Sequence, residues 1–414
     1  MNKYAIIILS TIILSFILDA VADYLNIKNL KTELPEEFKD TFDSETYTKS
    51  QNYLKVRTKF GYVSTIFSLV VMLLFWFCGG FPYLNNIINQ VSDSSIIKGI
   101  IFIGVLIVAN SIISLPFSIY STFVIEEKFG FNKTTFKTFI LDILKSLALG
   151  TVIGIPILAG ILYVLEFTGA YAWLYGWLGL TIISLLIQFI APRWLMPIFN
   201  KFTPLGEGEL REAITDYAKS VKYSLKNIFV IDGSRRSSKS NAFFTGFGKY
   251  KRIALFDTLI NKHTTNEIVS ILAHEIGHFK MKHILYGMLI GFIHNGVIFY
   301  LLSIFLSKKG LFEAFYMHDM PIYAGLIFFG MLYTPIETIL SLLMNILSRK
   351  NEYEADKFAA ETSGKSEDLI SALKKLSKDN LSNLTPHPFY VYLNYSHPTV
   401  YERIKNIRQT AADR

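Results

Sequence analysis

The chain has 414 residues, 51% of them apolar and 18% charged, and a formal net charge of +8. Soluble domains carry about 25% charged residues, so this composition excludes an ordinary water-soluble protein and predicts an integral membrane protein. The Lys and Arg residues flank apolar segments and form no basic, aromatic-rich patch of a nucleic-acid reader. We therefore expect contact with anionic lipids of the bilayer and no nucleic-acid partner.

Seven apolar segments are long enough to cross a bilayer as helices, which takes about 20 residues. They cover residues 4–24, 61–81, 99–123, 138–165, 173–197, 284–306 and 322–347. The first has a second interpretation, because a basic start, an apolar stretch and the triplet Ala20-Val21-Ala22 also occur in cleaved signal peptides. Cleavage there would leave the basic first loop outside the membrane, against the charge pattern of the other loops, so a retained span is favoured.

The single cysteine, Cys78, lies in the apolar run LLFWFCGGF at the end of the second segment. One cysteine excludes an intramolecular disulfide and any metal site built from several thiolates. We predict that Cys78 is a small buried apolar side chain.

Basic residues alternate between the connections and predict the orientation of the chain. The first and third loops, the polar stretch after the fifth span and the tail from Arg349 are rich in Lys and Arg, whereas the second and fourth loops have none. The positive-inside rule places the basic parts in the cytoplasm. Lys308 and Lys309, on the opposite side, depart from the pattern. A eukaryotic source would imply the ER membrane, and a bacterial one the inner membrane.

Several polar residues interrupt the apolar segments, namely Lys145, Gln188, His294, Asn295 and Glu337. Charged groups in hydrocarbon cost at least about 2.5–3.5 kcal/mol, so these side chains must face protein or water. Structural pairs between helices and a wet cavity inside the bundle both satisfy that requirement, and the sequence does not decide between them.

The polar stretch after the fifth span ends in the motif His274-Glu275-Ile276-Gly277-His278. Thr264 and Glu267 match a helix capping box just upstream, so the motif is predicted to be helical. Histidines at positions i and i+4 then share one face and can bind one zinc ion, with Glu275 as the general base that activates a water molecule. Chance occurrence on a surface helix is the alternative.

A third ligand would complete a catalytic site. His283 is five residues beyond His278, whereas the metzincin pattern requires histidine at position 284, which is Ile. Downstream, SRKNEYEADKFA (348–359) places Glu352 and Asp356 on one helical face and Glu354 roughly opposite. We predict that Glu352 is the third zinc ligand and that Asp356 accepts a hydrogen bond from a ligand histidine.

With these motifs the chain resembles the type 1 CAAX prenyl proteases, zinc metalloproteases with seven membrane spans. The resemblance extends over nearly the whole chain and includes FVIEEKFGFNKTT (123–135), PIFNKFTPLGEGELREAI (197–214), GSRRSSKSNAFFTGFGKYKRIALFDTLI (233–260) and SHPTVYERI (396–404). It implies that Asn241 and Ala242 lie on a strand edge that binds the substrate backbone. It also implies that His397 and Arg403 act near the zinc on the oxyanion or the substrate.

The resemblance further implies cleavage after a prenylated cysteine, which releases three C-terminal residues. A lipid-modified peptide would approach from the bilayer, which explains a water-activating motif next to a membrane span. A membrane-protein quality-control protease with non-prenylated substrates is the alternative. Two other classes are disfavoured. A site-2-type protease would carry the motif within an apolar span, and a seven-span transporter would have no use for Glu275.

We therefore predict a mainly α, polytopic membrane protein with seven transmembrane helices and a cytoplasmic α+β zinc metalloprotease domain, one zinc per chain. The segment NAFFTGF, a turn at Gly248–Tyr250 and KRIALF predict a small hairpin in that domain. The expected parts are residues 1–200 with five spans, 201–283 with the substrate strand and the HExxH helix, 284–347 with spans six and seven, and 348–414 with the rest of the protease domain.

Overall fold

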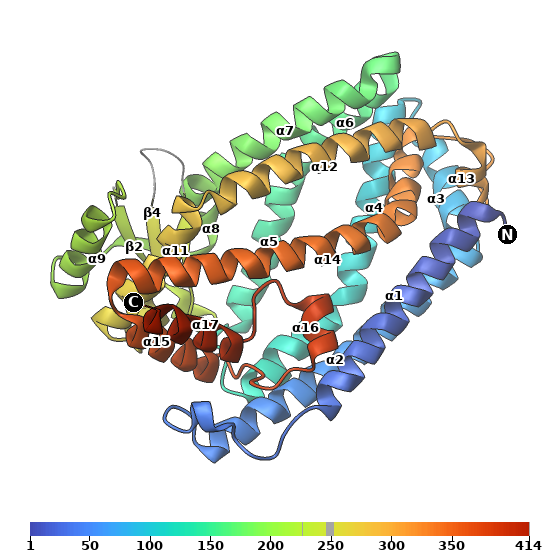
Figure 1. The fold of residues 1–414 in the computed structure, drawn as a ribbon. Coiled ribbons are helices and arrows are strands. Elements are labelled where there is room, and N and C mark those ends of the chain that lie inside the picture. Colours follow the sequence, from blue (N-terminus) through green and yellow to red (C-terminus); the bar gives the residue numbers. More distant parts are fainter. Residues whose placement is uncertain (226, 246–251, 414) are drawn as a thin grey trace.

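The computed structural model describes residues 1–225, 227–245 and 252–413. Long helices run through the molecule, and a small sheet with several shorter helices gathers at one end (Figure 1). Within the described residues, seven helices are long and apolar enough to cross a membrane, as predicted. They are α1 (Lys3–Lys28), α2 (Ser44–Phe77), Ser95–Glu126, Phe136–Phe167, Gly169–Phe199, α12 (His283–Phe305) and α14 (Ile322–Ser363).

Spans three to five are composite helices, each with a π-helical turn. They consist of α4 (Ser95–Tyr120) and η2 (Ser121–Glu126), then α5 (Phe136–Leu149), η3 (Gly150–Gly154) and α6 (Ile155–Phe167), then η4 (Gly169–Tyr171), α7 (Ala172–Ile190), η5 (Ala191–Leu195) and α8 (Met196–Phe199). Pro156 follows η3 and Pro192 lies within η5. Proline has no N–H group, so the regular helical hydrogen bonding is interrupted at these positions.

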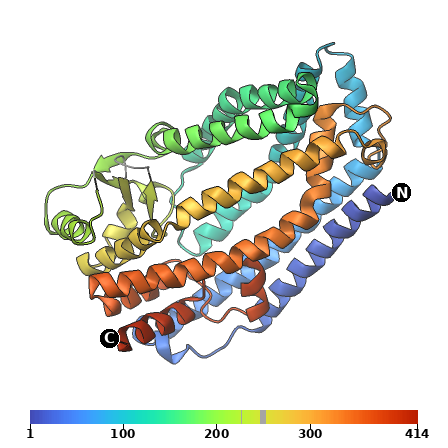
Figure 2. The same cartoon turned by 45° about the horizontal axis from the view of Figure 1, so that its top comes forward.

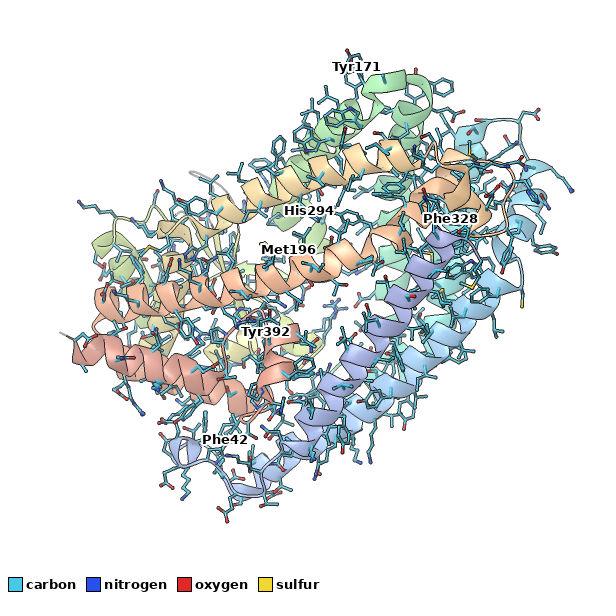
Figure 3. The ribbon with its side chains drawn as sticks, turned by 45° about the vertical axis from the view of Figure 1, so that its right-hand side comes forward. Phe42, Tyr171, Met196, His294, Phe328 and Tyr392 are labelled. Atoms are coloured by element: carbon cyan, nitrogen blue, oxygen red, sulfur yellow. The ribbon has the colours of Figure 1, made fainter. Side chains whose placement is uncertain are left out.

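The buried side chains of the described residues form two large cores at opposite ends of the spans and a small third cluster around Tyr53 and Phe131. The first contains aromatic side chains where α2, α3 (Gly80–Asn89), α13 (Lys309–Glu313) and the start of α14 meet. Phe315 and Phe328 stack there with ring centroids 3.9 Å apart. Figure 3 places Phe328 at this end and His294 and Met196 between the ends. Between the cores packing is sparse, since 6–17% of each span's most apolar window is buried.

The prediction for Cys78 was wrong, because its side chain is exposed at the end of α2. Its neighbour Trp76 is fully buried and donates a hydrogen bond from Nε1 to the Ala314 carbonyl at 2.8 Å. Hydropathy alone does not separate the lipid-facing side of a span from its protein-facing side, which explains the error.

The second core belongs to the end that carries the sheet. Its strands are β1 (Phe202–Pro204), β2 (Asn227–Ile231), β3 (Ala242–Thr245) and β4 (Arg252–Phe256), in the order β1-β2-β4-β3. The predicted antiparallel partnership of β3 and β4 is present, with Ala242 opposite Leu255. The sheet is larger than the predicted hairpin, because β2 pairs with β4 in parallel. The predicted turn at Gly248–Tyr250 lies outside the described residues.

Helices from the polar stretch and from the tail pack together around this sheet. They are α9 (Glu209–Ser220), α10 (Asp257–Ile260), α11 (Thr265–Lys280), α15 (Ser366–Asp379) and α17 (Val400–Ala412), whereas α16 (Pro388–Asn394) lies against α1 and α14. Their shared core includes Ile214, Leu272, Leu369 and Ile404. Figure 2 shows this group at the end of the long helices that lies away from the N-terminus. The fold therefore joins two stretches that are separated in sequence by α12 and most of α14.

Candidate metal centre

The HExxH motif occupies the last two turns of α11. The helix begins at the predicted capping box, in which the Thr264 hydroxyl accepts from the Glu267 N–H and the Glu267 carboxylate accepts from the Thr264 N–H. It ends at Met281, and Lys282, with φ +60°, turns the chain directly into α12. Gly277 lets α11 approach α14 closely, because a Cβ at this position would lie 3.1 Å from the Ala355 backbone.

Three predicted ligands converge between α11 and α14. His274 Nε2 lies 3.2 Å from His278 Nε2 and 3.5 Å from Glu352 Oε2, and His278 Nε2 lies 3.2 Å from Glu352 Oε1. Within the described chain, this is the group of three metal-ligating side chains whose donor atoms all lie within 4.8 Å of one another. His274 and Glu352 are buried, and His278 is partly buried.

These separations fit a small tetrahedral cation. Bonds of about 2.1 Å to nitrogen and oxygen place neighbouring ligand atoms about 3.4 Å apart in a tetrahedron, close to the separations found here. The Glu352 Oε2 atom is buried and has no hydrogen-bond partner among the described residues, as expected for an atom that faces a metal. The donor set of two imidazoles and one carboxylate is typical of catalytic zinc sites.

Asp356 and Arg403 contact His274 at Nδ1, the ring nitrogen that faces away from the other two ligands. The Asp356 Oδ1 atom lies 2.8 Å from His274 Nδ1, and Asp356 is fully buried. Arg403 donates to both oxygens of Asp356, from Nε at 2.8 Å and from Nη2 at 2.6 Å. Its Nη1 lies 3.4 Å from Glu352 Oε2. The Asp356 carboxylate is therefore fixed by a planar, bidentate partner while it accepts from the histidine.

The electrostatics of the site favour a cation. Burial and the Arg403 guanidinium lower the pKa of the His274 imidazole, but the Asp356 and Glu352 carboxylates outweigh both effects and raise the pKa to about 9. Burial likewise lowers the pKa of Arg403, and Asp356, Glu352 and Glu275 raise it above its usual range. The carboxylates that hold a proton on His274 would equally attract a metal ion, which replaces that proton when it binds.

The site opens into a cavity of about 260 Å³. All the predicted site residues line it except Asp356, which lies behind His274; the lining set comprises Asn241, Ala242, His274, Glu275, His278, Glu352, His397 and Arg403. Glu275 is partly exposed to the cavity and has no hydrogen-bond or ion-pair partner within the described chain. Its carboxylate is therefore open to a molecule bound in the cavity.

His397 and Arg403 differ in how they reach the cavity. The His397 side chain is 62% exposed and its Nε2 lies 3.3 Å from Glu352 Oε1. The Arg403 side chain is 11% exposed, and its guanidinium is hydrogen-bonded to Asp356. His397 is therefore available to a bound substrate, whereas Arg403 mainly holds other protein groups.

Sequence reasoning missed the apolar wall of this cavity. Leu369, Leu373 and Leu376 of α15 line it together with Leu259 and Ile271. The three leucines recur at intervals of four and three residues, which is the spacing of one helical face. That pattern was visible in the sequence and predicts a buried face, although not the cavity that it meets.

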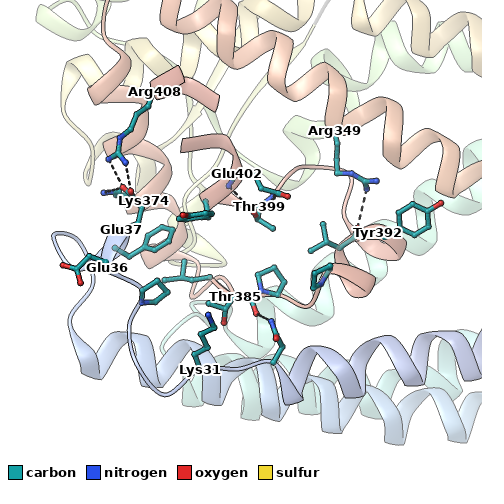
Figure 4. Close-up of a pocket in the computed structure, with 18 of the residues that line it drawn as sticks. Lys31, Glu36, Glu37, Arg349, Lys374, Thr385, Tyr392, Thr399, Glu402 and Arg408 are labelled. Carbon is teal, nitrogen blue, oxygen red and sulfur yellow. Dashed lines mark hydrogen bonds and ion pairs between the residues drawn. The ribbon is translucent and has the colours of Figure 1, made fainter. Parts of the chain in front are cut away.

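A larger groove of about 1270 Å³ lies near the other side of α17 (Figure 4). Two of its basic side chains share the carboxylate of Glu37. Lys374 Nζ lies 2.8 Å from Glu37 Oε1, and Arg408 Nη2 donates to the same carboxylate oxygen at 2.8 Å. The metal-ligating histidines and Glu275 do not line it. The chemistry therefore belongs to the smaller cavity.

Two protein families cover almost the whole chain between them. Residues 23–201 match the family described as CAAX prenyl protease N-terminal, five membrane helices, and residues 204–411 match peptidase family M48. The chain belongs to peptidase family M48. This M48 peptidase is accordingly a multi-pass membrane protein and a metalloendopeptidase that acts on peptides or proteins.

Its relatives match over most of their length. The CAAX prenyl protease 1 of Saccharomyces cerevisiae is 37% identical over 90% of this chain and 88% of its own, and the Homo sapiens homolog is 33% identical over 91% and 89%. The crystal structure of S. mikatae Ste24p covers 98% of this chain and 99% of its own, with a TM-score of 0.91 and 37% identity. The predicted family resemblance is thereby confirmed.

Proposed function

We propose that this M48 peptidase is a zinc endopeptidase that removes three C-terminal residues after a prenylated cysteine. The observation that carries the proposal is the convergence of His274, His278 and Glu352 on one cavity. The same cavity is lined by leucines of α15, which suit an aliphatic peptide. The name CAAX prenyl protease 1, which relatives from yeast and human carry, supports the substrate class.

His274, His278 and Glu352 would hold one zinc ion. Bound zinc lowers the pKa of a coordinated water molecule toward about 7 and polarises a carbonyl oxygen. The unpaired Glu275 carboxylate accepts the proton of the attacking water and returns it to the leaving amine. His397, the exposed histidine of the site, donates to the substrate oxygen that gains negative charge. Arg403 acts on the reaction through Asp356, which holds His274 in place.

The substrate backbone would bind along β3. This strand lies at an edge of the sheet, so one side of its backbone is free for a further strand. The Ala242 N–H donates to the Asn241 side chain at 2.8 Å, so Asn241 holds its place at the start of this edge. The leucines of α15 offer an apolar surface to the aliphatic residues that follow the prenylated cysteine.

We also propose that the sheet end faces the cytoplasm. The connection between α1 and α2 contacts α15 and α17 there, through ion pairs of Glu37 with Lys374 and Arg408. The third loop reaches the same end, where the Ser238 N–H donates to the Phe131 carbonyl at 3.1 Å. All the parts that the charge pattern assigns to the cytoplasm therefore meet. We keep the expected division of the chain into residues 1–200, 201–283, 284–347 and 348–414 as part of this proposal.

The deciding experiment uses the full chain purified in detergent and a farnesylated CAAX peptide. Cleavage after the modified cysteine is expected, with one zinc ion per chain. A chelator and Glu275→Gln should both abolish cleavage, and Glu275→Gln should retain the zinc. Cleavage of an unprenylated peptide at the same rate would favour quality-control substrates. A chain that binds no zinc would contradict the ligand assignment.

A further inference from the structure

We propose that His283 and Glu354 form a hydrogen-bonded relay that orients the metal ligand His278. The inference rests on the proposed role of His278 as a zinc ligand. His283 is neither a ligand nor a substrate contact in this scheme. It is a positioning residue, and Glu354 in turn positions His283.

The relay is continuous from the metal site to the protein surface. His278 Nδ1 lies 3.0 Å from His283 Nδ1, and His283 Nε2 lies 3.1 Å from Glu354 Oε2. His283 is 8% exposed, whereas the Glu354 side chain is 44% exposed. The left-handed Lys282 makes this contact possible, because it reverses the chain between α11 and α12 and brings His283 back beside the last turn of α11.

The tautomers of both histidines follow from these contacts. His278 presents Nε2 to Glu352 and His274, so its Nδ1 must carry the proton when Nε2 binds a metal. That N–H needs an acceptor, and His283 Nδ1 can accept only if the proton of His283 is on Nε2. The Glu354 carboxylate accepts this second N–H. One carboxylate therefore fixes the tautomers of two imidazoles.

The two ligand histidines are thus supported in different ways by the same helix. Asp356 accepts directly from His274, and Glu354 acts on His278 through His283. Partners of this kind typically change metal affinity by about 10–100-fold when they are removed. The simpler interpretation of Glu354 is a surface ion pair with Lys350, but that contact is long, at 3.8 Å. Exposed pairs of this kind contribute little to stability.

Zinc affinity of the full chain in detergent tests the relay without any substrate. We expect His283→Leu to weaken zinc binding at least about 10-fold, measured by competition with a chromogenic chelator. His283→Asn should remain within about threefold of the parent chain, because its side-chain oxygen can take the position of Nδ1 as acceptor. His263→Leu is the matched control, since His263 is equally 8% exposed and its ring Nδ1 lies within hydrogen-bond distance of the Leu259 carbonyl, not of a metal ligand.

Two results would overturn the inference. One is parent-like affinity in His283→Leu, and the other is an equal loss in all three histidine variants. If His283→Leu does not fold, the zinc affinities of Glu354→Gln and Glu354→Leu are compared instead. Gln keeps an acceptor oxygen and Leu does not, so the relay predicts weaker zinc binding in Glu354→Leu. Equal zinc affinities of that pair would also reject the relay. A chain that binds zinc but leaves prenylated peptides uncut would contradict only the proposed substrate.

Discussion

Arg403 contacts both buried carboxylates of the site, Asp356 and Glu352. It donates to both oxygens of a fully buried carboxylate, and its third nitrogen lies 3.4 Å from Glu352. Arg408, further along α17, makes a similar bidentate contact with Glu37, but its side chain is 47% exposed. Helix α17 therefore carries two bidentate arginine–carboxylate pairs, one buried and one exposed.

Replacing Arg403 by methionine should destabilise the chain strongly, because it removes the guanidinium that donates to both oxygens of the buried Asp356 carboxylate and leaves His274 as its remaining partner. Removing one partner of a buried ion pair costs about 3–5 kcal/mol, whereas an exposed pair contributes about 0–1 kcal/mol. We expect a large decrease in the thermal unfolding midpoint of Arg403→Met in detergent and a small one in Arg408→Met. Equal decreases would mean that burial does not set the strength of these pairs.

At the level of residues, the sequence predicts which side chains lie together where spacing within one helix is enough. His274 with His278 and Glu352 with Asp356 are each one turn apart, so helical periodicity alone places each pair on a shared face. His283 and Glu354 could not be paired in this way. Their contact depends on the backbone reversal at Lys282 and on the packing of two helices, neither of which the sequence pattern specifies.

The start of α11 is held by a buried carboxylate. Glu267 accepts from the Thr264 N–H at 2.9 Å, from Ser371 Oγ at 2.6 Å and from Lys375 Nζ at 2.7 Å. Burial raises the pKa of Glu267, but the hydrogen bonds from Lys375, Ser371 and Thr264 and the charge of Lys375 hold it below its ordinary value. The contact therefore links the metal-site helix to α15.

Glu267→Gln should make the chain less stable near neutral pH, with a difference that disappears in acid. A carboxyl group whose pKa is lowered by folding stabilises the fold above its unfolded pKa, near 4.3, and loses this effect as the pH falls through the folded value. We expect the thermal midpoints of the parent and the variant to differ between pH 5 and pH 7 and to converge as the pH falls through the lowered pKa of Glu267. A difference that is constant with pH would show that the charge of Glu267 is unimportant.

The segment before β3 is tied to the membrane spans. Arg236 forms a bidentate ion pair with Asp142 of α5, at 2.8 and 2.9 Å. The Arg236 carbonyl accepts from the Lys133 N–H at 3.1 Å and from Thr134 Oγ1 at 3.1 Å. These contacts hold the third loop against the chain that leads to Asn241. The position of β3, the proposed substrate strand, therefore depends on the fourth span.

Asp142→Asn should weaken substrate binding more than it slows the chemical step. The metal site lies on other elements, so we expect KM for the peptide to rise by about 3–10-fold with kcat nearly unchanged. Asp216→Asn is a suitable control, because Asp216 pairs with Lys219 on an exposed face of α9, with side chains 76% and 73% exposed. A decrease in kcat at constant KM would place the effect of Asp142 on the catalytic groups instead.

At the level of elements, the sequence predicted where strands lie better than it predicted which strands pair. The segments NAFFTGF and KRIALF, with the turn expected between them, predicted a hairpin, and the antiparallel pair of β3 and β4 is present. The parallel pairing of Asn227–Ile231 with Arg252–Phe256 was not predicted, because alternation identifies a strand without naming its partner. The same limit applies to the spans, whose number follows from hydropathy while their sparse packing does not.

The whole molecule consists of two packed ends joined by loosely packed helices. Tyr333 belongs to the first core and contacts His294, whose Nε2 lies 3.1 Å from the Tyr333 hydroxyl and 3.3 Å from Glu337 Oε2. The Glu337 side chain remains 55% exposed. A carboxylate at this depth requires water or a fully satisfying protein partner. The contacts and the exposure together favour water inside the helix bundle.

Accessibility of cysteine substitutions would test for this water directly. The exposed Cys78 is first replaced by serine, and Glu337→Cys is then compared with Ile339→Cys in lipid vesicles. Ile339 is 62% exposed and belongs to an apolar stripe with Ile336, Leu343 and Ile346, which lies on the opposite face of α14 from Glu337. A charged thiol reagent requires water to react. We expect it to modify Cys at position 337 at least about tenfold faster than at 339, because charged groups are strongly excluded from hydrocarbon. Equal protection of both positions would show that Glu337 is sealed by protein and that its pair with His294 is purely structural.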